Sequence, residues 1–535
     1  MFLKKNDFTG TMELLCLILR RDKIILPIFI FFMIILVVGV AASFQNLYPD
    51  EAVRQSFYLQ MQNNPSIVVI LGSVLDPSIG GLTAWRTGIF ASLIIGLFSI
   101  FLMIRHTRSE ERKGRLELLN STAVGKQAPL TAALITSFGL NLIIAILIGA
   151  GLTGIGLDLF SSMILGLSMA AFGCLFSAIA AVAVQLTESS GDARYLMISL
   201  LAGFFVIRIL GWDDGDYSWI SWLSPYGWVH YVQPFAGDEL WVLGLFLVFT
   251  ASLTVLGYYL SSLRDLGAGI ISQRMGPARA SKNLRNSFAL AWRIHRGMLI
   301  FWIILFTLMG TMLGFMAQSV TDIITANPQF VILISQLGGN TGVMDSYFAM
   351  VLAFLSEIFA IYAILATLKL QSQESKKYSE FILTNSIKRS QWAVSNLIFA
   401  VLGPALIITI FALSCGLAYG LSAGNLPDTL FKILGASLVY LPAIWILTSI
   451  SMLLFGLKPR LTSLSWVALG LFFIIDLLGE IFDFSPWIMN LSPFTQVPKL
   501  FAGDTISSSL GFIFILAVVL MLIGLEGYLR RDIFS

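Results

Sequence analysis

Long apolar runs alternate with short polar segments along the whole chain. A run of about 20 apolar residues is long enough to cross a lipid bilayer as a helix. Twelve such runs lie at roughly residues 24–44, 87–104, 130–152, 160–184, 194–211, 240–260, 298–316, 347–368, 392–417, 430–457, 461–478 and 507–528. The pattern predicts an all-α polytopic membrane protein with about twelve transmembrane helices, arranged as two tandem six-helix repeats with pseudo-twofold symmetry.

The polar segment between the second and third runs, residues 109–122, occurs twice. A shift of 263 residues without a gap places Glu111, Glu117 and Lys126 on Glu374, Glu380 and Arg389. Two further marks recur in both halves of the chain. They are Leu-Ser-Pro followed by Phe-Ala-Gly-Asp, at 223–238 and 491–504, and Arg-Asp, at 264–265 and 531–532. These matches indicate the duplication of one ancestral unit.

The duplication predicts the organisation of the chain into domains. We expect residues 1–266 to form a first six-span repeat, 267–285 a cytoplasmic linker, and 286–535 a second six-span repeat. The linker is rich in glycine and basic residues and is too short to form a domain.

Composition and charge narrow the class of protein. A hydrophobic fraction of 57% and a charged fraction of 12%, with a mean hydropathy of +0.86, are far from the averages of soluble domains. The net charge of +3 over 535 residues argues against a nucleic-acid partner. Cys16, Cys174 and Cys415 stand singly in apolar surroundings, so no disulfide or metal site is expected. The lipid bilayer is the expected environment, and a bacterial cytoplasmic membrane the expected location.

Lysine and arginine collect in alternate polar segments. They are frequent in 105–129, 262–296 and 369–390, whereas 212–239 and 317–346 are acidic or neutral. The positive-inside rule places the first group, and therefore both termini, in the cytoplasm. Before the first span, residues 11–21 have the pattern of a short interfacial helix, and 286–296 are their counterpart. The alternative is that each is simply an extension of the span that follows.

The sequence lacks a nucleotide-binding motif. Gly125-Lys126 is followed by Gln127 rather than by the hydroxyl residue of a phosphate-binding loop. No combination of serine, histidine and aspartate has the spacing of a catalytic site. We therefore expect no enzyme activity, and no cofactor bound by this chain.

The repeated segment 109–122 has the pattern of a short amphipathic helix. Ser109 and Ser372 are expected to cap it, with acidic residues in its first turn. Leu116, Leu119 and Ile382 would form an apolar side that suits docking into a groove on a partner protein. A solvated loop with topogenic charge is the alternative, but it leaves the repeated Glu, Leu and Ser/Thr pattern unexplained. The candidate coupling residues are Glu110, Glu111, Gly114, Leu116, Glu117, Leu118, Leu119 and Ser121, with Glu374, Lys376, Glu380, Phe381, Ile382 and Thr384 in the second copy.

Residues 110–122, with Glu-Glu, Gly114, Leu116 to Leu119 and Ser-Thr, resemble the coupling helix of type-2 ABC exporter permeases. The tandem halves, the linker and the Leu-Ser-Pro and Phe-Ala-Gly-Asp marks resemble more narrowly the family of permeases that export polyketide antibiotics. The resemblance implies an ATP-driven exporter that works with two copies of a separately encoded ABC ATPase, on which ATP and Mg bind. It implies efflux of hydrophobic or amphipathic antibiotics, such as polyketides or polyether ionophores, and thereby resistance. The second copy departs from the pattern, because Lys377 replaces the glycine and Asn385 follows Thr384.

Two further groups of residues are candidates for transport roles. The aromatic residues of the repeated outer marks are expected to form part of an outer gate: Tyr226, Trp228, Tyr231, Phe235, Phe494 and Phe501. The spans offer few polar groups, and we assign Asn141, Ser356 and Glu357 to the substrate path. An apolar path with few anchors suits a hydrophobic small molecule.

Other interpretations remain open at this point. A secondary drug transporter also has internal repeats, and Glu357 is the clearest charge within the spans. A structural role for Glu357, paired with a neighbour, is equally compatible with the sequence. An ABC permease for lipids or peptides, or a membrane scaffold or sensor, are further alternatives.

Overall fold

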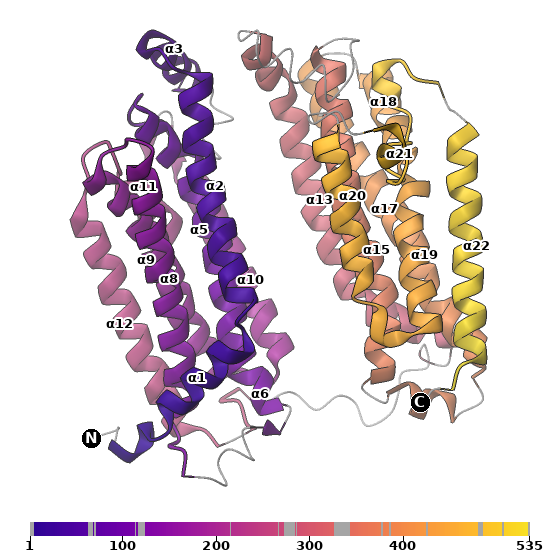
Figure 1. Ribbon diagram of the computed structural model, residues 1–535, viewed down its shortest axis with the longest axis horizontal. Coiled ribbons are helices and arrows are strands. Elements are labelled where there is room, and N and C mark those ends of the chain that lie inside the picture. The colour runs from indigo at the N-terminus through magenta and orange to yellow at the C-terminus, as the bar shows by residue number, and fades with distance from the viewer. Residues whose placement is uncertain are drawn as a thin grey trace. The chain divides into compact units, whose positions relative to one another are not determined.

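The computed structural model describes residues 5–62, 68, 71–112, 114–115, 123–213, 216–265, 267–271, 284, 286–325, 343–375, 378–384, 387–423, 426–479, 485–505 and 508–532. Twelve helices in these residues are long and apolar enough to cross a membrane. The prediction of an all-α polytopic membrane protein is therefore confirmed. The chain forms two compact units, 1–276 and 277–535, which are described separately below (Figure 1).

The first unit contains six candidate spans. They are α2 (Ile25–Leu47), α5 (Ile79–His106), α8 (Ala128–Gly154), α9 (Leu159–Leu186), α10 (Ser190–Leu210) and α12 (Leu240–Leu263). Shorter elements connect or precede them: η1 (Lys5–Phe8), α1 (Thr11–Arg21), α3 (Glu51–Gln62), α6 (Arg108–Arg112), η2 (Trp219–Leu223) and α11 (Pro225–Tyr231). A hairpin of two residues per strand, β1 (Trp212–Asp213) and β2 (Asp216–Tyr217), lies between α10 and η2.

Side-chain caps define where several spans begin. Ser78 Oγ accepts a hydrogen bond from Gly81 N at the start of α5. Asp158 Oδ2 accepts from Ser161 N at the start of α9, and Ser189 Oγ from Asp192 N at the start of α10. Each cap satisfies one of the backbone N–H groups that have no partner in the first turn of a helix.

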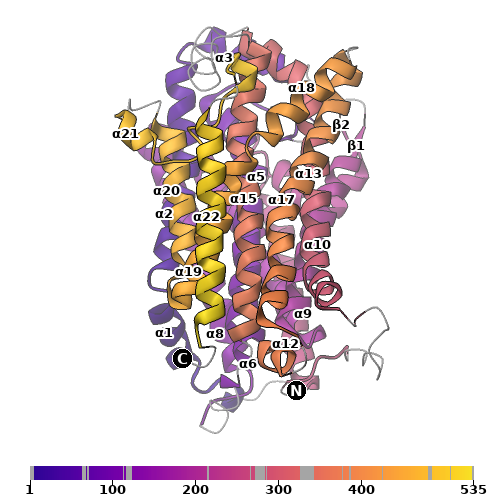
Figure 2. The ribbon, with the colours of Figure 1, turned by 90° about the vertical axis from the view of Figure 1, so that its right-hand side faces the viewer.

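The second unit also contains six candidate spans, some of them built from more than one helix (Figure 2). Its helices are α13 (Ser287–Thr325), α15 (Val343–Ser375), α16 (Tyr378–Leu383), α17 (Arg389–Ala423), α18 (Leu426–Leu438), α19 (Leu441–Leu457), η4 (Pro459–Leu461), α20 (Leu464–Gly479), α21 (Pro486–Met489), η5 (Leu500–Ala502) and α22 (Ser508–Arg530). α18 and α19 together correspond to the single helix α9. The break falls before Pro442 in the first turn of α19, because proline lacks the N–H that would continue the helix.

Small residues let neighbouring spans approach closely in both units. A side chain at Gly166 would overlap the carbonyl oxygen of Ala145, where α9 meets α8. A side chain at Gly456 would overlap the carbonyl oxygen of Gly524, where α19 meets α22. Within a bilayer, close packing of this kind is a main source of attraction between helices.

The two expected interfacial helices differ in the structure. α1 is a separate helix that ends at Asp22, whose buried carboxylate lies 2.7 Å from Arg105 Nη2 and 2.6 Å from His106 Nε2. The prediction of a separate helix over 286–296 is wrong, because α13 runs without a break from Ser287 through this segment. The counterpart of Asp22 is Gly297, which has no side chain to anchor a break. Residues 287–296 are thus an extension of the span.

Candidate functional site

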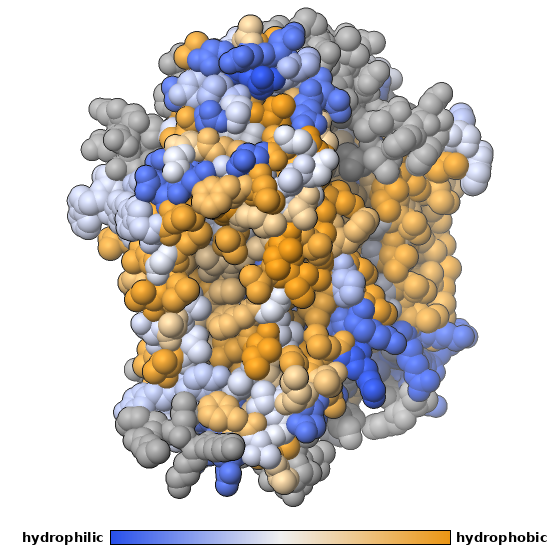
Figure 3. Space-filling model, turned by 60° about the vertical axis from the view of Figure 1, so that its left-hand side comes forward, coloured by the Kyte–Doolittle hydropathy of each residue, from blue (hydrophilic) through white to orange (hydrophobic). Residues whose placement is uncertain are grey.

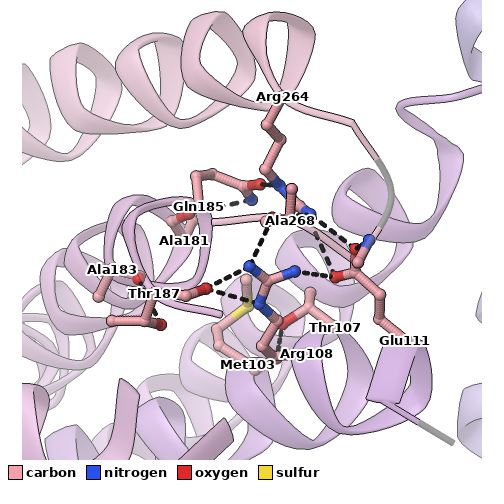
Figure 4. Close-up of polar contacts among 11 residues, drawn as sticks. Met103, Thr107, Arg108, Glu111, Ala181, Ala183, Gln185, Thr187, Arg264 and Ala268 are labelled. Atoms are coloured by element: carbon pink, nitrogen blue, oxygen red, sulfur yellow. Dashed lines mark hydrogen bonds and ion pairs between the residues drawn. The ribbon is translucent and has the colours of Figure 1, made fainter. Parts of the chain in front are cut away.

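In the first unit, a buried carboxylate joins the segment after the second span to the end of the sixth. Glu111 of α6 lies between two arginines: Arg264 Nη1 is 2.6 Å from Oε1, and Arg108 Nη1 is 2.6 Å from Oε2. Arg264 Nη2 adds a bond of 3.1 Å, and the backbone N–H of Gly267 donates to Oε1 at 2.7 Å (Figure 4). We call Arg108, Glu111 and Arg264 the first clasp.

The first clasp also reaches the loop between the fourth and fifth spans. The guanidinium of Arg108 donates to the carbonyl oxygens of Thr187 and, at 2.7 Å, Ala268 (Figure 4). Arg264 Nε donates to Gln185 Oε1 at the end of α9. Residues 270 and 271 add backbone bonds to Gln185 and Leu186. The clasp therefore connects the ends of the second, fourth and sixth spans of this unit.

The second unit repeats the arrangement with fewer charges. Arg531 Nη2 lies 2.7 Å from both carboxylate oxygens of Glu374. Arg531 also donates to Phe455 O at 3.2 Å, and its guanidinium carbon lies 4.9 Å from the centre of the Phe455 ring. We call Glu374 and Arg531 the second clasp. It connects the ends of α15, α19 and α22.

Equivalent residues make equivalent supporting contacts in the two units. Lys126 Nζ donates to the carbonyl oxygen of Arg264 at 3.2 Å, and Arg389 Nη1 donates to that of Arg531 at 2.9 Å. Arg108 corresponds to Gln371, whose Nε2 donates at 2.8 Å to Pro459 O in the loop between the fourth and fifth spans. The repeated sequence marks thus come together in space at both clasps.

Candidate coupling residues near the clasps therefore face inward. Glu111 and Glu374 are held in the clasps, and Glu110 pairs with Arg21 at 2.6 Å and with Arg115 at 3.1 Å. Gly114, whose φ of 71° suits glycine, ends the turn of α6 by donating to Glu111 O at 3.0 Å. Leu116, Glu117, Leu118, Leu119, Ser121 and Lys376, and the side chains of Glu380 and Phe381, lie outside the described residues.

The expected helix caps differ from those observed. Ser109 lies inside α6, which begins at Arg108, and Ser372 lies inside α15, which continues to Ser375. The prediction that these serines cap the segment is wrong, because the preceding helical turn already satisfies the backbone around Ser372. In α16, Ile382 packs against the buried cluster that includes Trp392, whereas Thr384 is exposed. Tyr378, which the sequence analysis did not select, is 48% exposed on this helix.

The clasp arginines were also missed as functional residues. Arg264 and Arg531 stand more than 150 positions from their glutamates. The one available signal was the repeated Arg-Asp pair at the end of each half. It marked equivalent positions but not their partners.

The outer marks fold into matching turns. Ser224 Oγ and Ser492 Oγ accept at 3.3 Å from the N–H groups of Tyr226 and Phe494, respectively. Asp238 Oδ1 accepts from Phe235 N at 3.1 Å, and Asp504 Oδ2 accepts from Lys499 N at 2.9 Å. Each aspartate thus closes the turn that precedes the last span of its unit.

The six candidate gate residues pack against the hydrophobic cores of their own units. Tyr226, Trp228, Phe494 and Phe501 are buried, and Tyr231 and Phe235 are half-buried. Tyr226 lies 4.7 Å from Phe172 between ring centres, and Phe501 lies 5.5 Å from Phe348. The described conformation therefore holds these side chains within each half.

The three candidate path residues differ in their surroundings. Asn141 is buried and bonds Ser99 of α5 at 3.1 Å. Ser356 donates to Ala353 O at 2.6 Å in its own helix. Glu357 is 3% exposed, and its Oε1 has no hydrogen-bond partner among the described residues. Asn141 belongs to the first unit and the other two to the second.

Comparison with known proteins gives the family. The family "Multidrug efflux system permease Rv1217c, C-terminal domain" matches residues 79–260 and 284–529. The chain belongs to the multidrug efflux permease family. It is 34% identical over 529 residues, 99% of this chain, to the multidrug efflux system permease protein Rv1217c of Mycobacterium tuberculosis, of which 96% is covered.

The family match includes part of each clasp. The two matched stretches contain Glu111 and Glu374 and end shortly before Arg264 and Arg531. Membership of the permease family and twelve candidate spans make this chain a multi-pass membrane protein.

Proposed function

We propose that the chain is the transmembrane permease subunit of an ATP-driven ABC exporter that removes hydrophobic or amphipathic antibiotics. In this proposal it resembles exporters of polyketide and polyether antibiotics more narrowly, and its transport confers resistance. Two six-span repeats, 1–266 and 286–535, take the place of two permease subunits. Both termini lie in the cytoplasm of a bacterial cell.

The observation that carries this proposal is the presence of two equivalent clasps. Each clasp connects the end of the second span of its unit, where the repeated segment begins, to the end of the sixth span, through Glu111 and Arg264 or Glu374 and Arg531. A force applied to that segment therefore reaches several spans of the same unit. Two such segments suit two copies of one ATPase subunit, which would bind ATP and Mg and perform the hydrolysis. The permease itself would have no enzymatic role.

Docking is then assigned to the part of each repeated segment that leaves the clasp. The inward-facing glutamates hold the segment, and residues 116–121 and 378–384 make the contact with the ATPase. Tyr378 and Thr384 contribute exposed groups to the second surface. The second copy of the segment has Lys377 at the position that Gly114 occupies in the first. We therefore expect the two docking surfaces to bind the ATPase with unequal affinity.

Charge reversal at the docking segments tests the assignment. Glu117→Lys with Glu380→Lys should reduce copurification of the ATPase and abolish drug-stimulated ATP hydrolysis in proteoliposomes. Glu526→Lys is the matched control, because Glu526 is an exposed glutamate with a 57% exposed side chain at the end of α22. Unchanged assembly and hydrolysis in the double variant would refute the coupling assignment.

The proposed cargo follows from the polarity of the spans. The described candidate path residues supply two neutral polar groups and one carboxyl group, so an apolar molecule with few polar anchors fits best. Expression with the ATPase in a sensitive bacterium should raise the inhibitory concentrations of polyketides or ionophores. A rise for lipid-linked or peptide antibiotics alone would instead favour an ABC permease for those molecules.

The outer turns are proposed to gate the path. A cysteine at Phe235 or Phe501 should react with an impermeant maleimide more rapidly in one nucleotide state than in the other, since both positions are largely shielded in the described conformation. Equal rates with and without trapped nucleotide would exclude this role.

One observation favours a second candidate, a secondary transporter coupled to ions. Glu357 is buried with an unpartnered oxygen among the described residues, and acidic groups within spans commonly serve ion coupling. Efflux that collapses with the proton gradient while ATP is maintained, and that is lost in Glu357→Gln, would support this candidate. Efflux that follows ATP alone would reject it.

A further inference from the structure

An apolar groove of about 670 Å³ opens in the first unit between α8, α9 and α12. Phe138 of α8 and Cys174 of α9 lie on one side, and α12 forms the other from Leu243 to Val255. All its lining residues belong to candidate membrane spans. The lining side chains of Leu247 and Val255 are more than 60% exposed. The space-filling view shows a broad band of apolar residues across the middle of the face that it draws (Figure 3).

The groove extends along α12. Its lining on α12 recurs once per turn at Leu243, Leu247, Thr250 and Thr254. With a rise of about 1.5 Å per residue, this stretch is roughly 18 Å long. A linear hydrocarbon chain fits such a shape.

The groove offers almost nothing polar to a ligand. It has no charged lining residue, and the hydroxyl of Thr254 donates to the carbonyl of Thr250 in its own helix at 2.7 Å. A drug with several polar groups would lose its hydrogen bonds to water without gaining others.

The second unit fills the corresponding space with its own side chain. Leu159–Leu186 aligns without a gap with residues 430–457, and this places Cys174 on Trp445. Trp445 Nε1 donates to Val401 O at 3.0 Å, and Val401 is the counterpart of Phe138. The indole also lies 5.8 Å from Phe514, the counterpart of Leu247, and packs against Ile513 and Ala517. An indole therefore lies where the first unit is hollow.

We propose that the groove of the first unit holds one acyl chain of a membrane phospholipid, in the place that the indole of Trp445 fills in the second unit. The chain is drawn from the surrounding bilayer, where hydrocarbon is present at the depth of these spans. The bound lipid is a fixed part of the first unit and has no equivalent at this position in the second. The proposal does not depend on the assignment of the transported cargo.

Exchange of the two side chains tests the proposal. The full chain is purified from membranes in mild detergent, and its retained phospholipids are counted by native mass spectrometry. Wild type should retain one more phospholipid than Cys174→Trp, and Trp445→Cys should retain one more than wild type. Equal lipid counts in wild type and a folded Cys174→Trp variant would overturn the proposal.

A second measurement covers the case in which Cys174→Trp does not fold. Wild-type protein in nanodiscs that contain a phosphatidylethanolamine with a diazirine in its acyl chain should give adducts on residues of α8, α9 and α12 that line the groove. Absence of adducts there, with adducts on other exposed span residues, would show that protein covers the groove and would overturn the proposal. Displacement of the retained lipid by a hydrophobic antibiotic would assign the groove to cargo and would also overturn it.

Discussion

The two clasps perform the same connection with different electrostatics. In the first, Glu111 lies between Arg108 and Arg264, and the side chain of Arg108 is only 1% exposed. In the second, the ion pair that Glu374 forms among the described residues is with Arg531, and the two side chains are 16% and 12% exposed. The ring of Phe455 takes part in the second clasp, and Gln371 stands where the first unit has Arg108.

The difference shows which parts of the arrangement the two units have in common. Both units keep a glutamate at the end of the second span, an arginine after the sixth, and a donor to the backbone between the fourth and fifth spans. The number of buried charges is not preserved. The buried Arg108 makes the first clasp more dependent on its carboxylate, because an unpaired buried charge is costly.

Removal of the clasp carboxylates should give the largest effect. Glu111→Gln leaves the buried Arg108 and the partly exposed Arg264 without the carboxylate that they share, and should lower the free energy of unfolding by about 3 to 5 kcal/mol. Glu374→Gln leaves one arginine that keeps its contacts with Phe455 and should cost about 1 to 3 kcal/mol. Unfolding in mixed detergent micelles measures both losses. Glu526→Gln, at an exposed pair, is the control and should cost less than about 1 kcal/mol.

Reversal of the charges should separate the clasps further. Glu374→Arg with Arg531→Glu should recover about 1 to 3 kcal/mol relative to the sum of the single variants, because the pair is restored in the opposite sense. Glu111→Arg with Arg264→Glu should recover little, since the new arginine faces Arg108. Equal recovery in both units would contradict the dependence of the first clasp on three charges. Unfolding of each single and double variant completes the two cycles.

The outer turns should show a smaller difference. Asp238 uses both carboxylate oxygens, for Phe235 N and for Ser161 Oγ at 2.7 Å, whereas Asp504 uses one oxygen for Lys499 N. Asp238→Asn must lose one acceptor and should cost about 1 to 2 kcal/mol. Asp504→Asn can keep its single bond and should cost less than about 1 kcal/mol. Thermal unfolding of the two variants provides the comparison. An equal or greater loss of stability in Asp504→Asn would contradict the prediction.

The smallest expected effect is a dependence on pH in the first unit. Burial, and in second place the charge of Arg208, lowers the pKa of His230 to about 3. The folded protein thus keeps this imidazole neutral, whereas the unfolded chain binds a proton below about pH 6.5. Stability should therefore decrease slightly as the pH falls from 7 to 5.5, and His230→Gln should reduce the decrease. An identical pH profile in wild type and variant would show that His230 does not contribute.

The spans were predictable because their signal is local. The apolar runs coincide with the twelve candidate spans, since the free energy of placing about 20 apolar residues in a bilayer depends on those residues alone. The positions at which helices break were less predictable from the sequence. The same basic and apolar pattern gives a separate helix before α2 and a continuous one in α13, because Asp22 finds Arg105 and His106 as partners and Gly297 has no side chain to do so.

The candidate site was predicted in part. The repeated glutamates and basic residues were recognised from the shift of 263 residues, but their assignment to docking did not anticipate that Glu111 and Glu374 face inward. Docking through 116–121 and 378–384 stays a prediction. The arginines that hold the glutamates are 153 and 157 positions away, and no local pattern predicts which distant charge a carboxylate meets.

The sequence by itself predicted the membrane class and the twelve candidate spans, and its repeated marks predict a duplication, because hydropathy and repetition are properties of the order of residues. Only the tertiary structure decided that each last span is tied to the segment after the second, and that Trp445 fills the volume left open beside Cys174. Such pairings depend on how close the helices pack and on which side chains then meet. Two aligned units of one chain can therefore share their helices and still differ in their buried charges and in their hollows.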